Sequence, residues 1–172
     1  MFVRSVALDP SNNEALNDLL SFYLRAPAFL GGGIERAVGL ARHIARIDPA
    51  EGHYAQALIE DKRKDYDAAE QQLRLALKLA PANPRHAMDL AIFLATHGRL
   101  NESEAMFDQA AAVAPYQARL LFEHANVYIS TQRNLEDARR LLQRYINSQL
   151  TPDDPPRQQA EALLKKIRDC CS

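Results

Sequence analysis

The chain has few of the features that mark several large classes of protein. It contains no tryptophan, and its only two cysteines, Cys170 and Cys171, are neighbours near the C-terminus. Two thiols are too few for a disulfide framework or a structural zinc site, so we expect exposed thiols here, with a redox or intermolecular disulfide role as the alternative. No apolar run reaches the roughly 18 residues of a membrane span, and the apolar run near the start is too short for a signal peptide. These absences favour a cytosolic protein.

Neither sign of charge dominates the sequence. The 21 basic and 22 acidic residues leave a net charge of −1. A nucleic-acid-binding protein normally carries a basic stripe, so we expect no nucleic-acid partner. With 47% hydrophobic and 25% charged residues, the composition is typical of a folded protein rather than a disordered one. The 172 residues suffice for one compact domain or one short solenoid.

One helical pattern organises the chain. In residues 66–81, apolar side chains recur at intervals of three and four residues and a proline ends the segment, which predicts one face of a helix. The same pattern returns 34 residues later and, less regularly, once before and once after. The four faces are Tyr66, Ala69, Leu73 and Ala76; Leu100, Ser103, Phe107 and Ala110; Ile34, Ala37, Ala41 and Ile44; and Leu135, Ala138, Leu142 and Tyr145.

A second helical pattern alternates with the first. Six residues after each of Pro10, Pro49, Pro81 and Pro115, a new apolar face begins. These faces start at Leu16, Ala55, Ala87 and Leu121. Two alternating helices in a period of about 34 residues indicate stacked helical hairpins. The sequence resembles the tetratricopeptide-repeat (TPR) family over nearly its whole length, although it lacks that family's tryptophan. The resemblance implies an all-α fold, a right-handed α-solenoid of stacked antiparallel helix hairpins.

The predicted repeats divide the sequence into six parts. They are a partial repeat at residues 1–10 that holds only a second helix; TPR-like repeats at residues 11–49, 50–81, 82–115 and 116–151; and a C-terminal capping helix in residues 152–172. We expect the capping helix to begin near Pro155 and Pro156, with Asp153 and Asp154 capping its N-terminus. Its apolar stripe consists of Ala160, Leu163, Leu164 and Ile167.

An enlarged, glycine-rich loop distinguishes the first repeat. Three glycines at residues 31–33 precede a helix that is predicted to begin near Ile34, and such a loop can hold phosphate on its backbone N–H groups. No predicted strand precedes the loop and no Gly-Lys-Ser/Thr sequence follows it, so we favour an extended turn that needs positive φ. Phe29 and Leu30 would project from this turn, to cap the first repeat or to contact a partner.

No group of side chains predicts catalysis. The histidines are His43, His53, His86, His97 and His124, and they show no metal-binding spacing. No serine or cysteine stands in a nucleophile motif. We therefore expect no metal, no cofactor and no enzymatic activity. His124 stands at a position that faces a neighbouring helix, and we expect it to be buried and hydrogen-bonded.

The resemblance to TPR proteins also implies a binding surface, because the first helices of successive hairpins in that family line a concave groove that binds peptides. At the corresponding positions this sequence has Asn17, Ser21 and Arg25; Gln56, Glu60 and Arg63; Arg85, Met88 and Ile92; and Arg119, Phe122, Asn126 and Ile129. Arg85 and Arg119 are 34 residues apart, so we expect them to stack on neighbouring hairpins and to favour a peptide with acidic groups. In the alternative interpretation, the arginine stems pack on neighbouring residues, and Met88 and Phe122 belong to the core.

These features predict a non-catalytic protein–protein interaction scaffold that binds a peptide or protein segment in the concave groove. Two alternatives stand beside this prediction. In the first, the partial repeat at residues 1–10 packs on another copy of the chain, so that the protein is a homo-oligomer. In the second, the chain is a regulatory segment of a larger multi-repeat protein or enzyme.

Overall fold

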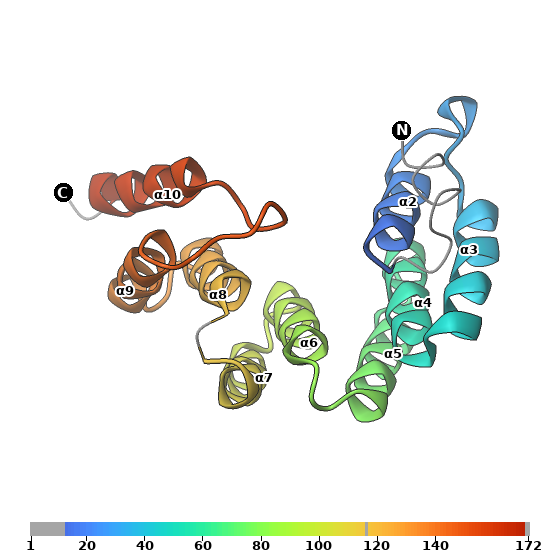
Figure 1. Cartoon of the computed structure of the whole chain (residues 1–172), viewed down its shortest axis with the longest axis horizontal. Helices are drawn as coiled ribbons and strands as arrows, with labels where there is room; N and C mark the ends of the chain where they lie inside the picture. Colours follow the sequence, from blue (N-terminus) through green and yellow to red (C-terminus); the bar gives the residue numbers. More distant parts are fainter. Residues whose placement is uncertain (1–12, 116, 171–172) are drawn as a thin grey trace. The chain divides into compact units, whose positions relative to one another are not determined.

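The computed structural model describes residues 13–115 and 117–170. Within these ranges the chain forms nine α-helices, one short 3-10 helix and no strand (Figure 1). The helices belong to two compact units, one that ends at Pro81 and one that begins at Ala82. The predicted all-α class and the pairing of the helices into hairpins are therefore confirmed. The predicted partial repeat at residues 1–10 lies outside the described residues.

The N-terminal unit holds two helix hairpins. The first is α2 (Asn13–Arg25) with α3 (Ile34–Ile47), and the second is α4 (Pro49–Arg63) with α5 (Tyr66–Leu79). Each helix of this unit packs on the next, and α2 also contacts α4. One core cluster consists of Leu16, Leu20, Ala37, Ala41, Ile44, Ala55 and Ile59. All of these residues lie on the two apolar patterns that the sequence predicts.

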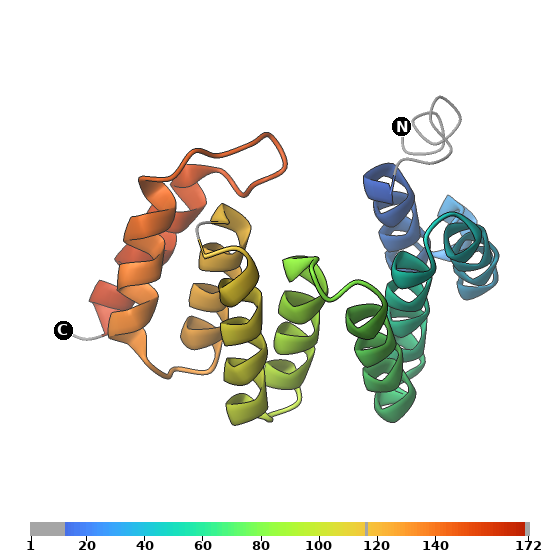
Figure 2. The same cartoon turned by 60° about the horizontal axis from the view of Figure 1, so that its bottom comes forward.

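The C-terminal unit holds two further hairpins and a last helix. The hairpins are α6 (Pro84–Thr96) with α7 (Leu100–Val113), and α8 (Ala118–Ser130) with α9 (Leu135–Ile146); α10 (Arg157–Cys170) packs on α9. Figure 2 shows these helices side by side. The last hairpin and α10 share a core that includes Ala125, Ala138, Leu142, Tyr145, Ala160 and Ile167. The apolar stripe of the predicted capping helix therefore contributes to this core.

Side-chain caps fix the starts of α4 and α6, each of which is the first helix of its hairpin. Asp48 Oδ1 accepts hydrogen bonds from the backbone N–H groups of Ala50 and Glu51 at the start of α4. Asn83 Oδ1 accepts one from the N–H of Arg85 at the start of α6. Each cap is followed by a proline in the first turn, where a missing N–H breaks no helical hydrogen bond. These caps fix where α4 and α6 begin.

α10 begins close to the predicted position, but Asp154 does not cap it. α10 begins at Arg157, beyond both prolines and three residues after Asp154. Asp154 Oδ2 instead accepts hydrogen bonds from the backbone N–H and the hydroxyl of Thr151, at 2.8 and 2.9 Å. The prediction that Asp154 caps the helix is therefore wrong. The physical reason is that the two prolines separate this residue from the helix, so that its carboxylate closes a turn.

Candidate protein-binding surfaces

α6 and α8, the first helices of the two C-terminal hairpins, pack against each other and carry equivalent ion pairs. Arg85 Nε lies 3.6 Å from Asp89 Oδ2, and Arg119 Nε lies 2.8 Å from Glu123 Oε1. Arg119 Nη1 also donates to the backbone oxygen of Asp153 at 3.3 Å. Since the two arginines are 34 residues apart, the same arrangement occurs twice. Each arginine is paired with an acid of its own helix, so the surface carries both signs of charge.

The other predicted groove residues of this unit differ in burial. Ile92, Asn126 and Ile129 are partly exposed, and Asn126 Nδ2 donates to Glu123 Oε2 at 3.4 Å. We refer to the partly or fully exposed set as the α6/α8 surface: Arg85, Asp89, Ile92, Arg119, Glu123, Asn126 and Ile129. Met88 and Phe122 are not included, because they are only 5% and 2% exposed.

Phe122 belongs to the interior of the last hairpin. The centroid of its ring lies 5.0 Å from that of Tyr145, which is on α9, and both rings belong to the same core cluster. Phe122 is therefore a core residue, as the alternative interpretation of the sequence proposed, and does not line a groove. A buried aromatic ring stabilises the fold chiefly through the apolar area that it removes from water. Its substitution would perturb folding as well as any surface beside it.

The predicted groove residues of the N-terminal unit are partly engaged in packing between helices. Asn17 Nδ2, on α2, donates to Glu51 Oε2, on α4, at 2.9 Å. Asn13 Nδ2 donates to Asp48 Oδ2 at 3.2 Å and joins α2 to the residue that caps α4. Ser21 is partly buried, and Arg25 is exposed at the end of α2. On α4, Glu60 accepts hydrogen bonds from both Gln56 and Arg63 of the same helix.

The loop between α2 and α3 has the form of an extended turn. Gly31 and Gly33 have φ angles of 92° and 135°, which favour glycine. The N–H groups of Gly31, Gly32 and Gly33 donate to the carbonyl oxygens of Ala28, Pro27 and Tyr23. Because all three donors are used within the protein, this loop cannot hold phosphate in the way that a phosphate-binding loop does.

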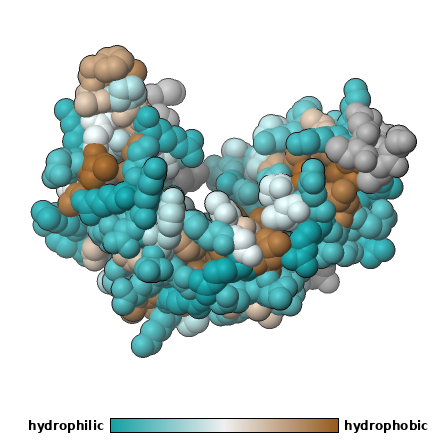
Figure 3. Space-filling model, turned by 180° about the vertical axis from the view of Figure 1, so that it is seen from behind, coloured by the Kyte–Doolittle hydropathy of each residue, from teal (hydrophilic) through white to brown (hydrophobic). Residues whose placement is uncertain are grey.

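The same loop exposes two large apolar side chains. Phe29 and Leu30 lie in a single 3-10 turn, η1 (Ala28–Leu30), and are 85% and 61% exposed. Arg36 Nη1 donates to the oxygen of Gly31 at 2.8 Å and ties the turn to α3. Figure 3 shows hydrophobic surface at the tip of the N-terminal unit, where Figure 1 draws this loop. An ordered turn that presents apolar groups to solvent is typical of a contact surface.

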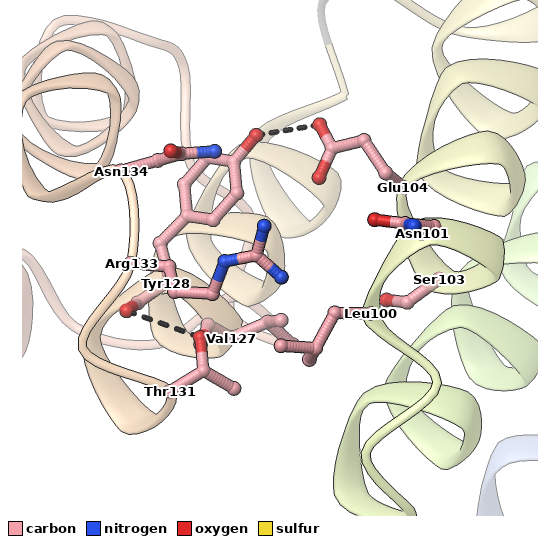
Figure 4. Close-up of a pocket in the computed structure, with 9 residues that line it drawn as sticks. All are labelled: Leu100, Asn101, Ser103, Glu104, Val127, Tyr128, Thr131, Arg133 and Asn134. Atoms are coloured by element: carbon pink, nitrogen blue, oxygen red, sulfur yellow. Dashed lines mark hydrogen bonds between the residues drawn. The ribbon is translucent and has the colours of Figure 1, made fainter.

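A small polar pocket lies between α7, α8 and the turn that leads to α9 (Figure 4). Its volume is about 80 Å³, and it is lined by Leu100, Asn101, Ser103, Glu104, Val127, Tyr128, Thr131, Arg133 and Asn134. We refer to it as the α7/α8 pocket. The Tyr128 hydroxyl donates to Glu104 Oε1 at 2.5 Å and bridges the two helices. None of these residues was predicted from the sequence to belong to a site.

His124 lies beside this bridge. Its Nε2 is 3.1 Å from Glu104 Oε1, and its ring stacks on Phe107 with 4.1 Å between centroids. Burial lowers the pKa of His124 below its ordinary value, although the Glu104 carboxylate opposes the change. Burial, followed by the hydrogen bond to Glu104, raises the pKa of Tyr128. His124 is therefore neutral at pH 7 and occupies the position between helices that the sequence predicts.

The described residues offer neither a cluster of metal ligands nor a membrane-spanning helix. In residues 13–115 and 117–170, no group of three or more His, Cys, Asp or Glu side chains is arranged to hold a metal ion. None of the described helices combines the length and the apolar character that crossing a bilayer requires.

Solved structures share this arrangement of helices. Two crystal structures of MamA superpose on this chain, each with a TM-score of 0.53. The first is 15% identical in sequence, and the match covers 94% of this chain and 87% of the MamA chain. The second is 16% identical, and the match covers 88% of this chain and 85% of the MamA chain. YrrB, described as a TPR protein with an unusual peptide-binding site, gives a TM-score of 0.44 at 15% identity over 96% of this chain and 98% of its own. The sequence matches no protein-family model and no curated protein.

The class of fold follows from the helices and the likeness to the two MamA structures together. The chain is an all-α protein built from antiparallel helix hairpins. More particularly, its fold is TPR-like, as the repeat pattern of the sequence predicted.

Proposed function

We propose that the protein is a non-catalytic interaction scaffold that binds an extended peptide or protein segment on the α6/α8 surface. The observation that carries this proposal is the repetition of one surface pattern on two packed helices. Arg85, Asp89 and Ile92 stand at i, i+4 and i+7 on α6, and Arg119, Glu123 and Asn126 stand at the same spacing on α8. Such positions share one helix face.

The chemistry of these side chains suits a polar segment of backbone. An asparagine amide both donates and accepts hydrogen bonds, as a peptide group does, and an arginine fork matches carboxylate and carbonyl oxygens. The partly exposed Ile92 and Ile129 add apolar area. An acidic ligand must compete with Asp89 and Glu123 for the two arginines, so an acidic preference requires that it release these ion pairs.

Paired capture of partners from lysate of the source organism tests the proposal. The baits are the wild-type chain and Arg85→Glu/Arg119→Glu/Asn126→Ala, which changes only side chains with solvent exposure. The matched control is Arg74→Glu/Arg140→Glu, because these exposed arginines also pair with acids of their own helices, α5 and α9. Partners that bind the wild type and the control but not the triple variant support the proposal. Partners that bind all three equally overturn it.

The exposed Phe29 and Leu30 favour a second candidate function, which is self-association into a homo-oligomer. Two apolar side chains at the tip of an ordered turn can contact another copy of the chain. Light scattering over a wide range of concentrations tests this candidate, with Phe29→Ser/Leu30→Ser as the comparison. A concentration-dependent mass that the double substitution abolishes supports it, whereas a monomer at every concentration removes it.

A further inference from the structure

Ser103 is an unusual residue at its position in the repeat. The three other hairpins have alanine there, namely Ala37, Ala69 and Ala138, and all four residues are buried. Ser103 is only 2% exposed, and its Oγ has no hydrogen-bond partner among the described residues. Alanine would pack as well without burying a hydroxyl. The Ser103 hydroxyl lines the α7/α8 pocket and points into it (Figure 4).

Arg133 is the second unusual residue of the pocket. Arg99, 34 residues earlier, forms an ion pair with Glu102, and its Nη2 lies 2.6 Å from Glu102 Oε2. The acid three residues after Arg133 is Glu136, but Glu136 Oε2 lies 3.8 Å from Arg139 Nε instead. Among the described residues, the Arg133 guanidinium has no ion pair, and it points into the pocket (Figure 4).

The pocket is lined by one carboxylate, that of Glu104, and by several side chains that can donate hydrogen bonds. Glu104 Oε1 accepts from Tyr128 and lies 3.1 Å from His124 Nε2. Arg133 and the side-chain amides of Asn101 and Asn134 line the pocket beside the Ser103 hydroxyl. A volume of about 80 Å³ equals that of two or three water molecules. The space thus suits the head group of one side chain rather than a whole amino acid.

We infer that the α7/α8 pocket binds a carboxylate of the partner, carried by an acidic side chain or by a chain terminus. Arg133 holds the carboxylate by charge-assisted hydrogen bonds, and the Ser103 hydroxyl donates to it from the floor of the pocket. The inference rests on the proposed function because it assumes a protein partner. It names a contact on a different surface, since the pocket lies between α7 and α8 and shares no residue with the α6/α8 surface.

Titration of the full ¹⁵N-labelled chain with three small probes tests the inference by NMR. N-acetyl-aspartate N-methylamide carries a side-chain carboxylate, N-acetylalanine carries a terminal carboxylate, and N-acetyl-asparagine N-methylamide is the neutral control. We expect saturable shifts of the Ser103, Arg133 and Asn134 amide signals with one or both carboxylates and none with the control. The probe that binds more tightly identifies the source of the carboxylate.

Substitutions distinguish binding of the probe in this pocket from binding elsewhere on the molecule. Arg133→Gln is expected to weaken binding of the carboxylate probe about tenfold, and Ser103→Ala about threefold, while Arg99→Gln, the equivalent arginine, leaves it unchanged. Arg85→Glu/Arg119→Glu is also expected to leave it unchanged, so that failure of the α6/α8 proposal is distinguishable from failure of this one. The absence of saturable shifts, equal binding of the neutral probe, or full affinity in Arg133→Gln would overturn the inference and leave water as the occupant.

Discussion

The turn between α2 and α3 and the turn between α8 and α9 join helices in equivalent hairpins, but they present opposite chemistry. The first turn is locked by glycines and holds Phe29 and Leu30 out in solvent. The second turn has no glycine, and its Gln132 and Asn134 adopt positive φ angles of 53° and 48°. It places Arg133 and Asn134 over the polar α7/α8 pocket.

The difference shows where this fold tolerates variation. The helices that follow the two turns keep their packed faces, because Ala37, Ala41, Ala138 and Leu142 are all buried. Turn residues contribute little to the core between helices. A repeat can therefore acquire a new contact surface at its turn, while the period of its apolar residues stays fixed by packing.

The largest change in the free energy of unfolding is expected from a substitution in the turn between α2 and α3. A Cβ built on Gly32 would lie 1.8 Å from the backbone oxygen of Ala26, so Gly32→Ala should force the turn apart and lower the free energy of unfolding by about 2–4 kcal/mol. Gly39→Ala is the control: its Cβ meets open space within α3, and it should raise stability by about 0.5–1 kcal/mol. Urea unfolding measures both. Equal effects of the two substitutions would show that the turn is not tightly constrained.

The next largest change in the free energy of unfolding is expected from a substitution of Ser103, which lines the α7/α8 pocket. Ser103→Ala removes a buried hydroxyl that has no partner among the described residues, so it should raise the free energy of unfolding by about 1 kcal/mol in the absence of a ligand. The measurement is thermal or urea unfolding of the free chain. A loss of stability would mean that the hydroxyl makes a favourable contact in the folded state.

A smaller effect should appear in the pH dependence of stability. Because burial lowers the pKa of His124, the unfolded chain takes up a proton below the ordinary value of 6.5 that the folded chain does not. Stability is therefore fully present above pH 6.5 and falls as the pH decreases through the window below it. The decrease in unfolding free energy from pH 7.5 to pH 5.5 should be larger in the wild type than in His124→Gln. Identical decreases would contradict the lowered pKa.

The smallest effect on stability is expected at the tip of the first turn. Phe29 and Leu30 are mostly exposed, so Phe29→Ser/Leu30→Ser should change the free energy of unfolding by no more than about 0.5 kcal/mol. If the two residues form a contact surface, the substitution alters association and leaves folding intact. A loss of more than about 2 kcal/mol would place these side chains in the folded core instead.

Much of the fold was predictable because packing imposes a period on the sequence. Ala69, Leu73 and Ala76 on α5 recur as Ser103, Phe107 and Ala110 on α7, and all six are buried. The turn at residues 31–33 was also predictable, since positive φ selects glycine. The turn that Asp154 closes before α10 was not, because an aspartate near a proline serves a cap and a turn equally well.

The candidate sites were less predictable for a geometric reason. A residue such as Phe122 stands between the face that packs and the face that is exposed, and a small rotation of α8 decides between them. The bond between Tyr128 and Glu104 joins residues 24 positions apart on separate helices, and no periodic pattern marks it. The serine at position 103, where the other repeats have alanine, is the signal that would have directed attention to the α7/α8 pocket.

The most direct test of the central claim is a hydrogen–deuterium exchange footprint of the chain with a captured partner, compared with the free chain. We expect the partner to slow exchange in α6 and α8 of the wild-type chain, and to leave exchange unchanged in Arg85→Glu/Arg119→Glu/Asn126→Ala at the same partner concentration. Protection confined to residues 26–33, or protection that persists in the triple variant, would contradict the assignment of the α6/α8 surface as the binding site.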